Sequence, residues 1–119
     1  MEKVNVSEPL HACYLDELTE AAPHLVRLAG VAVTLCLSAQ GEVYAFENRC
    51  THGNVPLHKG PWDPQTARLT CPAHQAVFAL REGGRPAVGP AVLPLELFSV
   101  TLVDIEGRVS LRVALPDDE

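Results

Sequence analysis

Two cysteine–histidine pairs lie close together in the middle of this 119-residue chain. Cys50 and His52 are separated by one residue, Cys71 and His74 by two, and residues 53–70 separate the two pairs. Thiolate and imidazole are both strong ligands of transition metals. The spacing therefore predicts that the four side chains bind one metal centre, which constrains the fold because two separate loops must meet around it.

The four side chains allow three interpretations. They could be unconnected, they could form a tetrahedral structural zinc site of the Cys2His2 type, or they could hold a [2Fe–2S] cluster with two cysteines on one iron and two histidines on the other. A zinc finger or ribbon normally pairs cysteine with cysteine and histidine with histidine. Here each loop is mixed, which favours a two-iron cluster, and a zinc-stabilised β-domain acting as an interaction module is the alternative.

Proline and glycine are concentrated around these pairs. Seven of the ten prolines lie between Pro56 and Pro94, and five of the eight glycines lie between Gly53 and Gly89. Proline removes a backbone donor and glycine permits positive φ, so such a stretch forms defined loops. We expect one domain, residues 1–119, with a β base made of residues 1–47 and 91–119. A loop-rich cluster-binding subdomain of about residues 48–90 is inserted into it.

The flanking sequence alternates between apolar and polar residues, which is typical of strands. Residues 31–37 and 42–46 predict a hairpin that turns at Gln40-Gly41, and residues 95–115 predict a second hairpin that turns at Glu106-Gly107. Two short strands, 67–71 and 76–80, flank the second cysteine–histidine pair, and residues 14–20 form one helical turn or a polar loop. The predicted fold class is all-β, an antiparallel sandwich or small barrel.

Charge and hydropathy narrow the function. The net charge is −6, which argues against a nucleic-acid binder. Residues 49–85 nevertheless carry five basic and two acidic side chains, a balance of +3, which raises the hypothesis of a docking face for an acidic partner. No apolar run reaches the roughly 18–20 residues of a membrane helix. The first residues do not read as a secretory signal, so we expect a cytoplasmic monomer that does not contact membranes.

The motifs resemble a known family. Two motifs are similar to the two cluster-binding boxes of Rieske-type [2Fe–2S] proteins. The first is "CTHG" with Leu57 and Gly60 downstream, and the second is "CPAHQAVF". "GPAVLPLELF", from Gly89, resembles the proline loop that covers the cluster in that family. The resemblance runs from about Val31 to Val113.

The resemblance implies one [2Fe–2S] cluster per chain with a definite ligand set. Cys50 and Cys71 would hold the inner iron, and His52 and His74 would hold the outer iron near the surface. These four residues are our predicted cofactor and metal ligands, and we predict no catalytic residue.

The departures from the family pattern indicate a low-potential centre. High-potential members carry an extra cysteine in each box and join the two by a disulfide, whereas Gly53 and Ala73 stand at or beside those places here. A serine and a tyrosine that donate hydrogen bonds to the cluster in those members are replaced by Ala76 and Phe78. Fewer donors stabilise the added electron less, so we expect a midpoint at the low end of the Rieske range, about −150 mV.

The function implied by the resemblance is a soluble Rieske-type ferredoxin. It would carry single electrons from a flavin reductase to a terminal oxygenase such as an aromatic-ring dioxygenase, as an electron-transfer component that is not itself an enzyme. The alternative is the small Rieske-like subunit of a nitrite-reductase-type enzyme, which often lacks the ligands that are all present here.

Other reactive side chains receive structural interpretations. Cys36 lies in an apolar strand-like run and is expected to be a small buried residue, and Cys13 is expected to be structural or incidental. His58 is expected to be solvated or to cap a loop. Trp62, the only tryptophan, is expected to pack a loop, with an exposed docking anchor as the other possibility.

Overall fold

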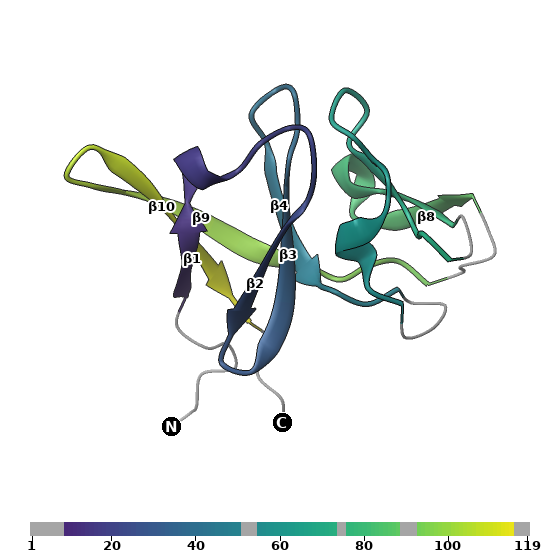
Figure 1. The fold of residues 1–119 in the computed structure, drawn as a ribbon, viewed down its shortest axis with the longest axis horizontal. Helices are drawn as coiled ribbons and strands as arrows, with labels where there is room; N and C mark the ends of the chain where they lie inside the picture. Colours follow the sequence, from purple (N-terminus) through teal and green to yellow (C-terminus); the bar gives the residue numbers. More distant parts are fainter. Residues whose placement is uncertain (1–8, 51–54, 74–75, 89–92, 116–119) are drawn as a thin grey trace.

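The computed structural model describes residues 9–50, 55–73, 76–88 and 93–115. Two antiparallel sheets make up this part of the chain (Figure 1), which confirms the all-β prediction. The six-stranded sheet has the order β1-β10-β9-β4-β3-β2. Its strands are β1 Leu10–Tyr14, β2 His24–Leu28, β3 Val31–Leu37, β4 Val43–Glu47, β9 Leu97–Ile105 and β10 Arg108–Ala114.

The second sheet is small and comes entirely from the middle of the chain. Its order is β5-β6-β7-β8. The strands are β5 Trp62–Asp63, β6 Arg68–Thr70, β7 Val77–Ala79 and β8 Arg85–Val88. Three single turns of 3-10 helix complete the described structure: η1 Leu15–Glu17, η2 Leu57–Lys59 and η3 Leu80–Glu82. No helix in the described ranges is long and apolar enough to cross a membrane.

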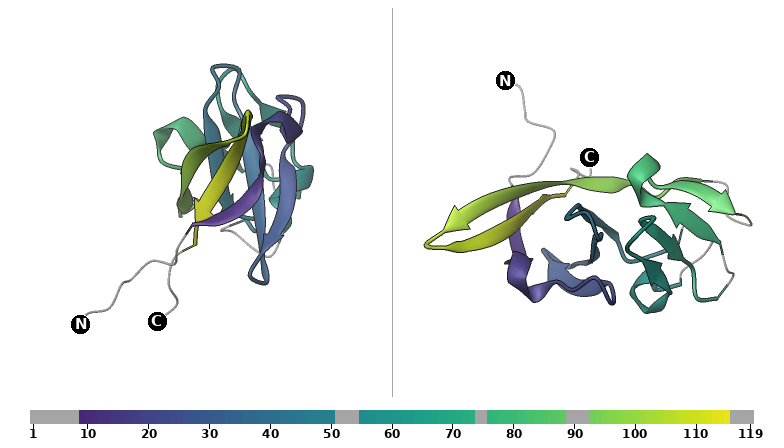
Figure 2. Two further views of the ribbon diagram at one scale, coloured as in Figure 1. Left: turned by 90° about the vertical axis from the view of Figure 1, so that its left-hand side faces the viewer. Right: turned by 90° about the horizontal axis from the view of Figure 1, so that it is seen from above.

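The six-stranded sheet curls on itself towards a barrel. Its two edge strands, β1 and β2, approach within 8 Å between Cα atoms, and the view from above in Figure 2 shows the strands wrapping around a common interior. Residues 31–37 form β3 as predicted, while its partner β4 begins one residue later than expected. The turn between them is closed by the Ser38 N–H, which donates to the Glu42 carbonyl at 2.9 Å.

The second predicted hairpin is also present. Glu106 and Gly107 have φ of 53° and 91° and form the two-residue turn between β9 and β10. Positive φ at both central positions matches the twist of the flanking strands. The Asp104 carboxylate accepts the Gly107 N–H at 3.0 Å and stabilises the turn.

Several strands were not predicted. In β2 burial alternates along the strand, but the apolar residue Leu25 lies on the exposed face, so hydropathy does not follow the alternation. Its turn into β3 uses Ala29 at φ 50° followed by Gly30, and alanine is an unusual residue at positive φ. β1 contains a bulge between His11 and Cys13, which breaks the two-residue period.

The buried side chains form two cores, one on each face of β3 and β4. The base core lies inside the curled sheet; its fully buried members are Val33, Leu35, Ala45, Leu111 and Val113. The second core, called here the loop-side core, lies between the two sheets. It consists of Cys36, Phe46, Cys50, Leu57, Leu69, Cys71, Ala76, Phe78, Leu80 and Leu95. The two cores therefore share β3 and β4 as a common wall.

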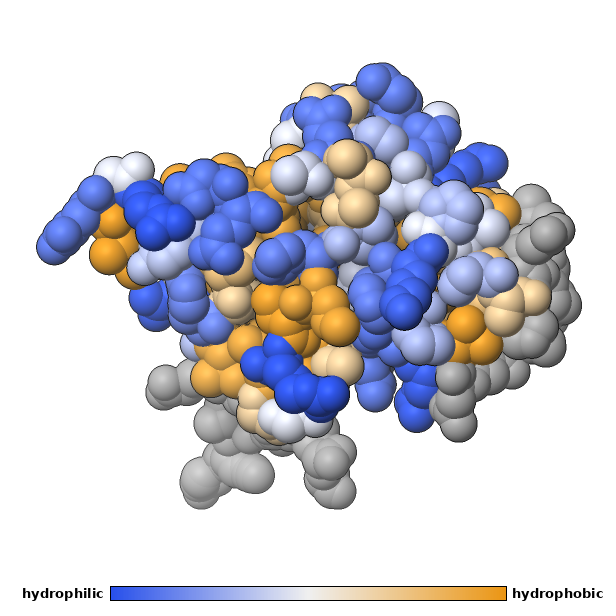
Figure 3. Space-filling view, in the orientation of Figure 1, coloured by the Kyte–Doolittle hydropathy of each residue, from blue (hydrophilic) through white to orange (hydrophobic). Residues whose placement is uncertain are grey.

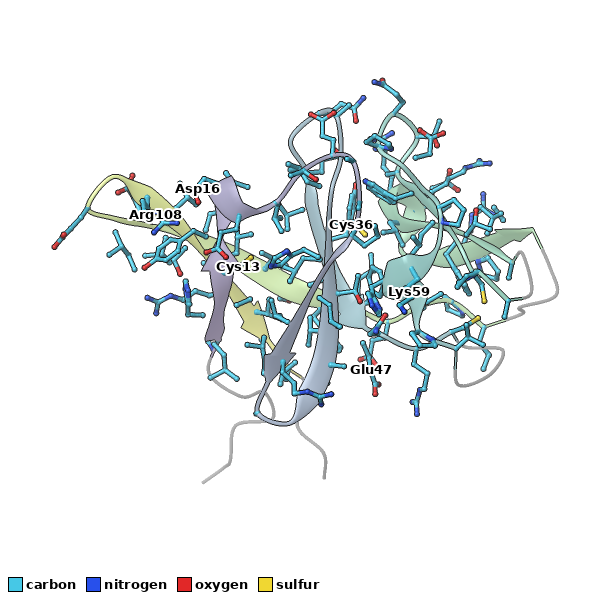
Figure 4. The ribbon with its side chains drawn as sticks, viewed as in Figure 1. Cys13, Asp16, Cys36, Glu47, Lys59 and Arg108 are labelled. Carbon is cyan, nitrogen blue, oxygen red and sulfur yellow. The ribbon has the colours of Figure 1, made fainter. Side chains whose placement is uncertain are left out.

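β3 illustrates this shared position. The sequence places Val33 and Leu35 on one face, and both are fully buried in the base core. Thr34 and Cys36 on the opposite face are fully buried as well, and Figure 4 shows Cys36 between the two sheets. The small sheet covers this second face, which alternation alone does not reveal.

Polar contacts join the small sheet to the β3–β4 turn. The Ala39 N–H donates to the Pro64 carbonyl at 2.9 Å, and the indole N–H of Trp62 donates to the Leu37 carbonyl at 3.1 Å. The Trp62 ring is half-buried against the loop-side core, which agrees with the loop-packing interpretation. On the far side of the base, the Arg108 guanidinium binds Asp16 at 2.8 Å (Figure 4).

Leu35→Ala tests the base core. Leu35 is fully buried, so its truncation leaves a cavity and lowers the free energy of unfolding by about 2–5 kcal/mol. Leu102→Ala is the matched control, since Leu102 is 55% exposed and its truncation changes stability by about 0.5 kcal/mol or less. Urea unfolding followed by circular dichroism measures both, and equal losses in the two variants would contradict the described core.

Glu42→Gln tests the connection between the sheets through its pH dependence. The pKa of the Glu42 carboxyl is lowered from its ordinary 4.5. The main cause is the hydrogen bond donated by the Arg81 guanidinium, followed by the one donated by the Tyr44 hydroxyl. A lowered pKa stabilises the fold above 4.5, and this stabilisation is lost as the pH falls through the folded-state pKa. We expect Glu42→Gln to melt below the wild type at neutral pH and together with it in strong acid.

The control for that measurement is Glu20→Gln. Glu20 is exposed and forms no ion pair with the described residues. A thermal shift that is the same at neutral and acidic pH for Glu42→Gln would contradict the assignment.

Candidate metal centre

The structure describes two of the four predicted ligands. Cys50 and Cys71 are 2% and 0% exposed, and both belong to the loop-side core. His52 and His74 lie outside the described residues. Two cysteines that are distant in sequence are therefore packed into one apolar region, and the ligand roles of all four residues stay a prediction.

Each cysteine begins a loop that is closed in the same way. The Cys50 N–H donates to the Val55 carbonyl at 3.0 Å, and the Cys71 N–H donates to the Ala76 carbonyl at 2.7 Å. In both loops the acceptor lies five residues after the cysteine, and the sequence places one histidine inside each closed segment. The chain thus carries two similar loops, each with one thiol at its base.

The strands explain where the loops begin. β4 ends at Glu47, three residues before Cys50, and β6 ends at Thr70, directly before Cys71. β7 then begins at Val77, directly after the residue that closes the second loop. Both cysteines are therefore anchored by the sheet hydrogen bonds of the preceding strands.

Gly60 brings the two loop regions into contact. A Cβ at this position would lie 1.9 Å from the Thr70 carbonyl oxygen and 3.1 Å from Cδ of Pro72. The Thr70 N–H also donates to the Pro61 carbonyl at 3.0 Å. Only glycine allows this approach, so the segment that follows the first loop is held directly against the residues on either side of Cys71.

Asn48 is a polar residue at the site that sequence reasoning missed. Its carboxamide oxygen accepts the backbone N–H groups of Leu57 and His58, both at 2.8 Å, and its amide nitrogen lies 2.9 Å from Nδ1 of His58. The His58 ring thus bonds the Asn48 side chain, and Asn48, rather than His58, caps the start of η2. No motif in the sequence marks Asn48, because its partners are nine and ten residues away.

The other two cysteines have different surroundings. Burial, with smaller contributions from Glu17 and Asp16, raises the pKa of Cys13 to about 11, and burial raises the pKa of Cys36 as well. Both therefore carry a neutral thiol at physiological pH, and neither forms a disulfide. This agrees with their interpretation as buried structural residues.

The predicted basic docking face is smaller than the sequence suggests. Arg81 pairs with Glu42 at 2.8 Å, Arg49 with Glu47 at 3.6 Å, and Arg85 with Glu82. Glu42 and Glu47 come from outside the basic segment, so the balance of +3 in sequence does not become an equal excess in space. Within the described residues, Lys59 is an exposed cation of this segment that forms no ion pair.

The described residues form few features of a substrate-binding site. A small hollow of about 210 Å³ is lined by Leu25, Val26, Arg27 and Ala32, next to the apolar area over β2 in Figure 3. It brings together no acid–base pair. Among the described residues, which do not include His52 and His74, no group of three or more histidine, cysteine or acidic side chains is assembled.

The donor set fits an iron–sulfur cluster. Two buried thiols lie at the bases of two similar loops, and each loop has one histidine in its sequence. This set matches the mixed ligation of a [2Fe–2S] centre with two cysteines on one iron. Comparison with known proteins gives the same family. The family model of the Rieske [2Fe-2S] domain matches residues 8–99.

This chain belongs to the Rieske [2Fe-2S] family. It is 31% identical over 106 residues to the 3-phenylpropionate/cinnamic acid dioxygenase ferredoxin subunit of Photorhabdus laumondii, covering 88% of this chain and 94% of that protein. It is also similar to a chain in the structure of the complex of reduced oxygenase and oxidized ferredoxin in carbazole 1,9a-dioxygenase. The TM-score to that structure is 0.72 at 28% identity, over 87% of this chain and 92% of the other.

Rieske proteins of respiratory complexes match less completely. The cytochrome bc1 complex Rieske subunit of Corynebacterium diphtheriae is 39% identical over 67 residues, which cover 56% of this chain and 16% of that protein. The chain thus spans about one sixth of that relative, and the likeness concerns the Rieske domain only.

Gly60→Ala tests the contact between the loops. The added methyl group would overlap the Thr70 carbonyl, so we expect a loss of at least about 2 kcal/mol of stability and a lower iron content. Gly83→Ala is the control: it adds the same group where no atom lies within 4 Å, at φ 76°, loses about 1–2 kcal/mol through backbone strain alone and keeps its iron. Thermal unfolding and iron analysis measure both, and wild-type values for Gly60→Ala would refute the contact.

Proposed function

We propose that this protein is a Rieske-type ferredoxin whose [2Fe–2S] cluster is held by Cys50, His52, Cys71 and His74. The observation that carries the proposal is the burial of Cys50 and Cys71 in one core, at the bases of two loops closed by equivalent backbone hydrogen bonds. The near-complete match to a ferredoxin subunit supports it and favours a ferredoxin over a nitrite-reductase subunit.

The proposal includes a division of labour within the domain. Residues 1–47 and 91–119 act as the base and residues 48–90 as the cluster-binding part. Strands β5 to β8 all lie between residues 62 and 88 and form a sheet of their own, which supports this division. The shared wall of β3 and β4 keeps the two parts in one rigid unit.

The bound cluster supplies one-electron oxidation and reduction. The residues of this chain contribute a dry and stiff environment: Leu57, Leu69 and Phe78 are fully buried in the core that contains the two cysteines. A low-dielectric site with few mobile groups undergoes little rearrangement when its charge changes. Ala76 and Phe78 are buried without a hydroxyl group, which supports a low midpoint potential.

The partners of this chain belong to the same proposal. We infer a terminal oxygenase as electron acceptor, because a related ferredoxin forms a complex with its oxygenase, and a flavin reductase as donor. By its likeness to ferredoxin subunits, we also propose that this carrier is cytoplasmic and monomeric. Lys59 on η2, exposed and next to the first loop, is the described cation best placed to meet an acidic partner.

Single substitutions of the ligands test the assignment. We expect Cys50→Ala and Cys71→Ala to lose the cluster, because each removes a thiolate from the inner iron. Cys13→Ala, in the base core, serves as the control and keeps its cluster. Iron and acid-labile sulfide per chain are the measured quantities, and a full complement in Cys71→Ala would reject the ligand set.

A redox titration tests the type of centre. We expect a midpoint of about −150 mV for the wild type. Ala76→Ser is expected to raise it, because a hydroxyl that donates to the cluster stabilises the reduced state. A wild-type midpoint well above 0 mV would contradict the low-potential assignment, and Ala73→Ser, at an exposed position of the same loop, provides the comparison.

A further inference from the structure

Asn48 joins the base sheet, through its backbone, to the start of η2, through its side chain. Its own backbone N–H donates to the Ala32 carbonyl of β3 at 2.8 Å, so the residue is attached to the base sheet. Its side-chain oxygen accepts from Leu57 and His58 at the start of η2. Asn48 therefore connects the base directly to the segment in which the first loop ends.

The orientation of the amide follows from its partners. Backbone N–H groups only donate, so the atom that faces Leu57 and His58 must be the oxygen. The amide nitrogen then faces Nδ1 of His58 at 2.9 Å and donates to it. The His58 ring is accordingly the tautomer with its proton on Nε2, and the Asn48 side chain uses both its acceptor and its donor.

The residue at the N-cap position of η2 cannot supply this cap. The N-cap position of η2 is Pro56, which has no polar side chain and makes no capping hydrogen bond. Leu57 is fully buried, and a buried N–H without an acceptor is costly. Asn48 thus supplies from a distance the acceptor that the start of η2 lacks.

The position of η2 in turn relates the two loops. On one side η2 is held by Asn48, and on the other Gly60 lies against Thr70, directly before Cys71. The first loop is also closed by the bond from Cys50 to Val55. Displacement of η2 would therefore alter where the Cys50 loop lies relative to the Cys71 loop.

We propose that Asn48 is a positioning residue of the cluster site: through η2 it sets where Cys50 lies relative to Cys71. This inference rests on the proposed function, because the geometry matters to the cluster only if these loops hold it. Asn48 does not ligate iron. It acts on the ligands through the backbone of residues 57–60.

Asn48→Ala and Asn48→Asp separate positioning from a general loss of stability. Asn48→Ala removes all three side-chain bonds, and we expect a changed EPR spectrum of the reduced cluster and about tenfold faster cluster loss on warming. Asn48→Asp keeps an oxygen that accepts both N–H groups, and its second oxygen accepts from His58 once the ring proton moves to Nδ1, so we expect it to restore the wild-type spectrum. Gln65→Ala is the control, because it removes an exposed side-chain amide that forms no hydrogen bond with the described residues. We expect it to leave both quantities unchanged.

The outcomes distinguish this inference from the proposed function. A wild-type protein without a [2Fe–2S] spectrum would refute the proposed function itself. A wild-type cluster together with an unchanged spectrum and unchanged cluster loss in Asn48→Ala would overturn the positioning role alone. If Asn48→Ala does not fold, Asn48→Gln decides, because the same amide displaced by one methylene must still change the spectrum, and a wild-type spectrum would overturn the inference.

Discussion

The contact of Gly60 with the backbone of Thr70 is the constraint on which the candidate site depends. It brings the end of the first cysteine–histidine loop against the strand that leads into the second. Without it, Cys50 and Cys71 would lie at the ends of two independent connections. With it, both thiols are buried in one core that excludes water. A site of this kind uses backbone contact, and not side-chain charge, to bring its ligands together.

The second requirement is a rigid support, and β3 and β4 provide it. One face of this pair closes the base core, and the other carries Cys36 and Phe46 into the loop-side core. The small sheet has short strands of two to four residues. Its stability comes from packing on this shared wall and from the contacts of Trp62 and Arg81 with the β3–β4 hairpin. A carrier with one fixed environment for its cluster follows from this arrangement.

Local patterns in the sequence predict some elements well and others not at all. The β3–β4 and β9–β10 hairpins could be predicted because alternation and turn residues agree there. β1 and β2 could not, since a bulge at His11–Cys13 and an alanine at positive φ remove those signals. The cysteine–histidine spacing indicated a shared metal centre, and the resemblance of "CTHG" and "CPAHQAVF" to the boxes of Rieske proteins predicted the family. The roles of Asn48 and Gly60, and the pairing of Arg81 with Glu42, depend on residues that meet only after folding.

The central claim is that two mixed loops each give one thiolate and one imidazole to a single two-iron cluster. Pulsed EPR of the reduced protein, prepared with histidine labelled with ¹⁵N, tests this most directly. The account predicts hyperfine coupling from two imidazole nitrogens in the wild type. In His52→Cys or His74→Cys, the coupling from one of these nitrogens disappears and the other remains. A reduced cluster without any histidine coupling, or a colourless protein that contains zinc in place of iron, would contradict it.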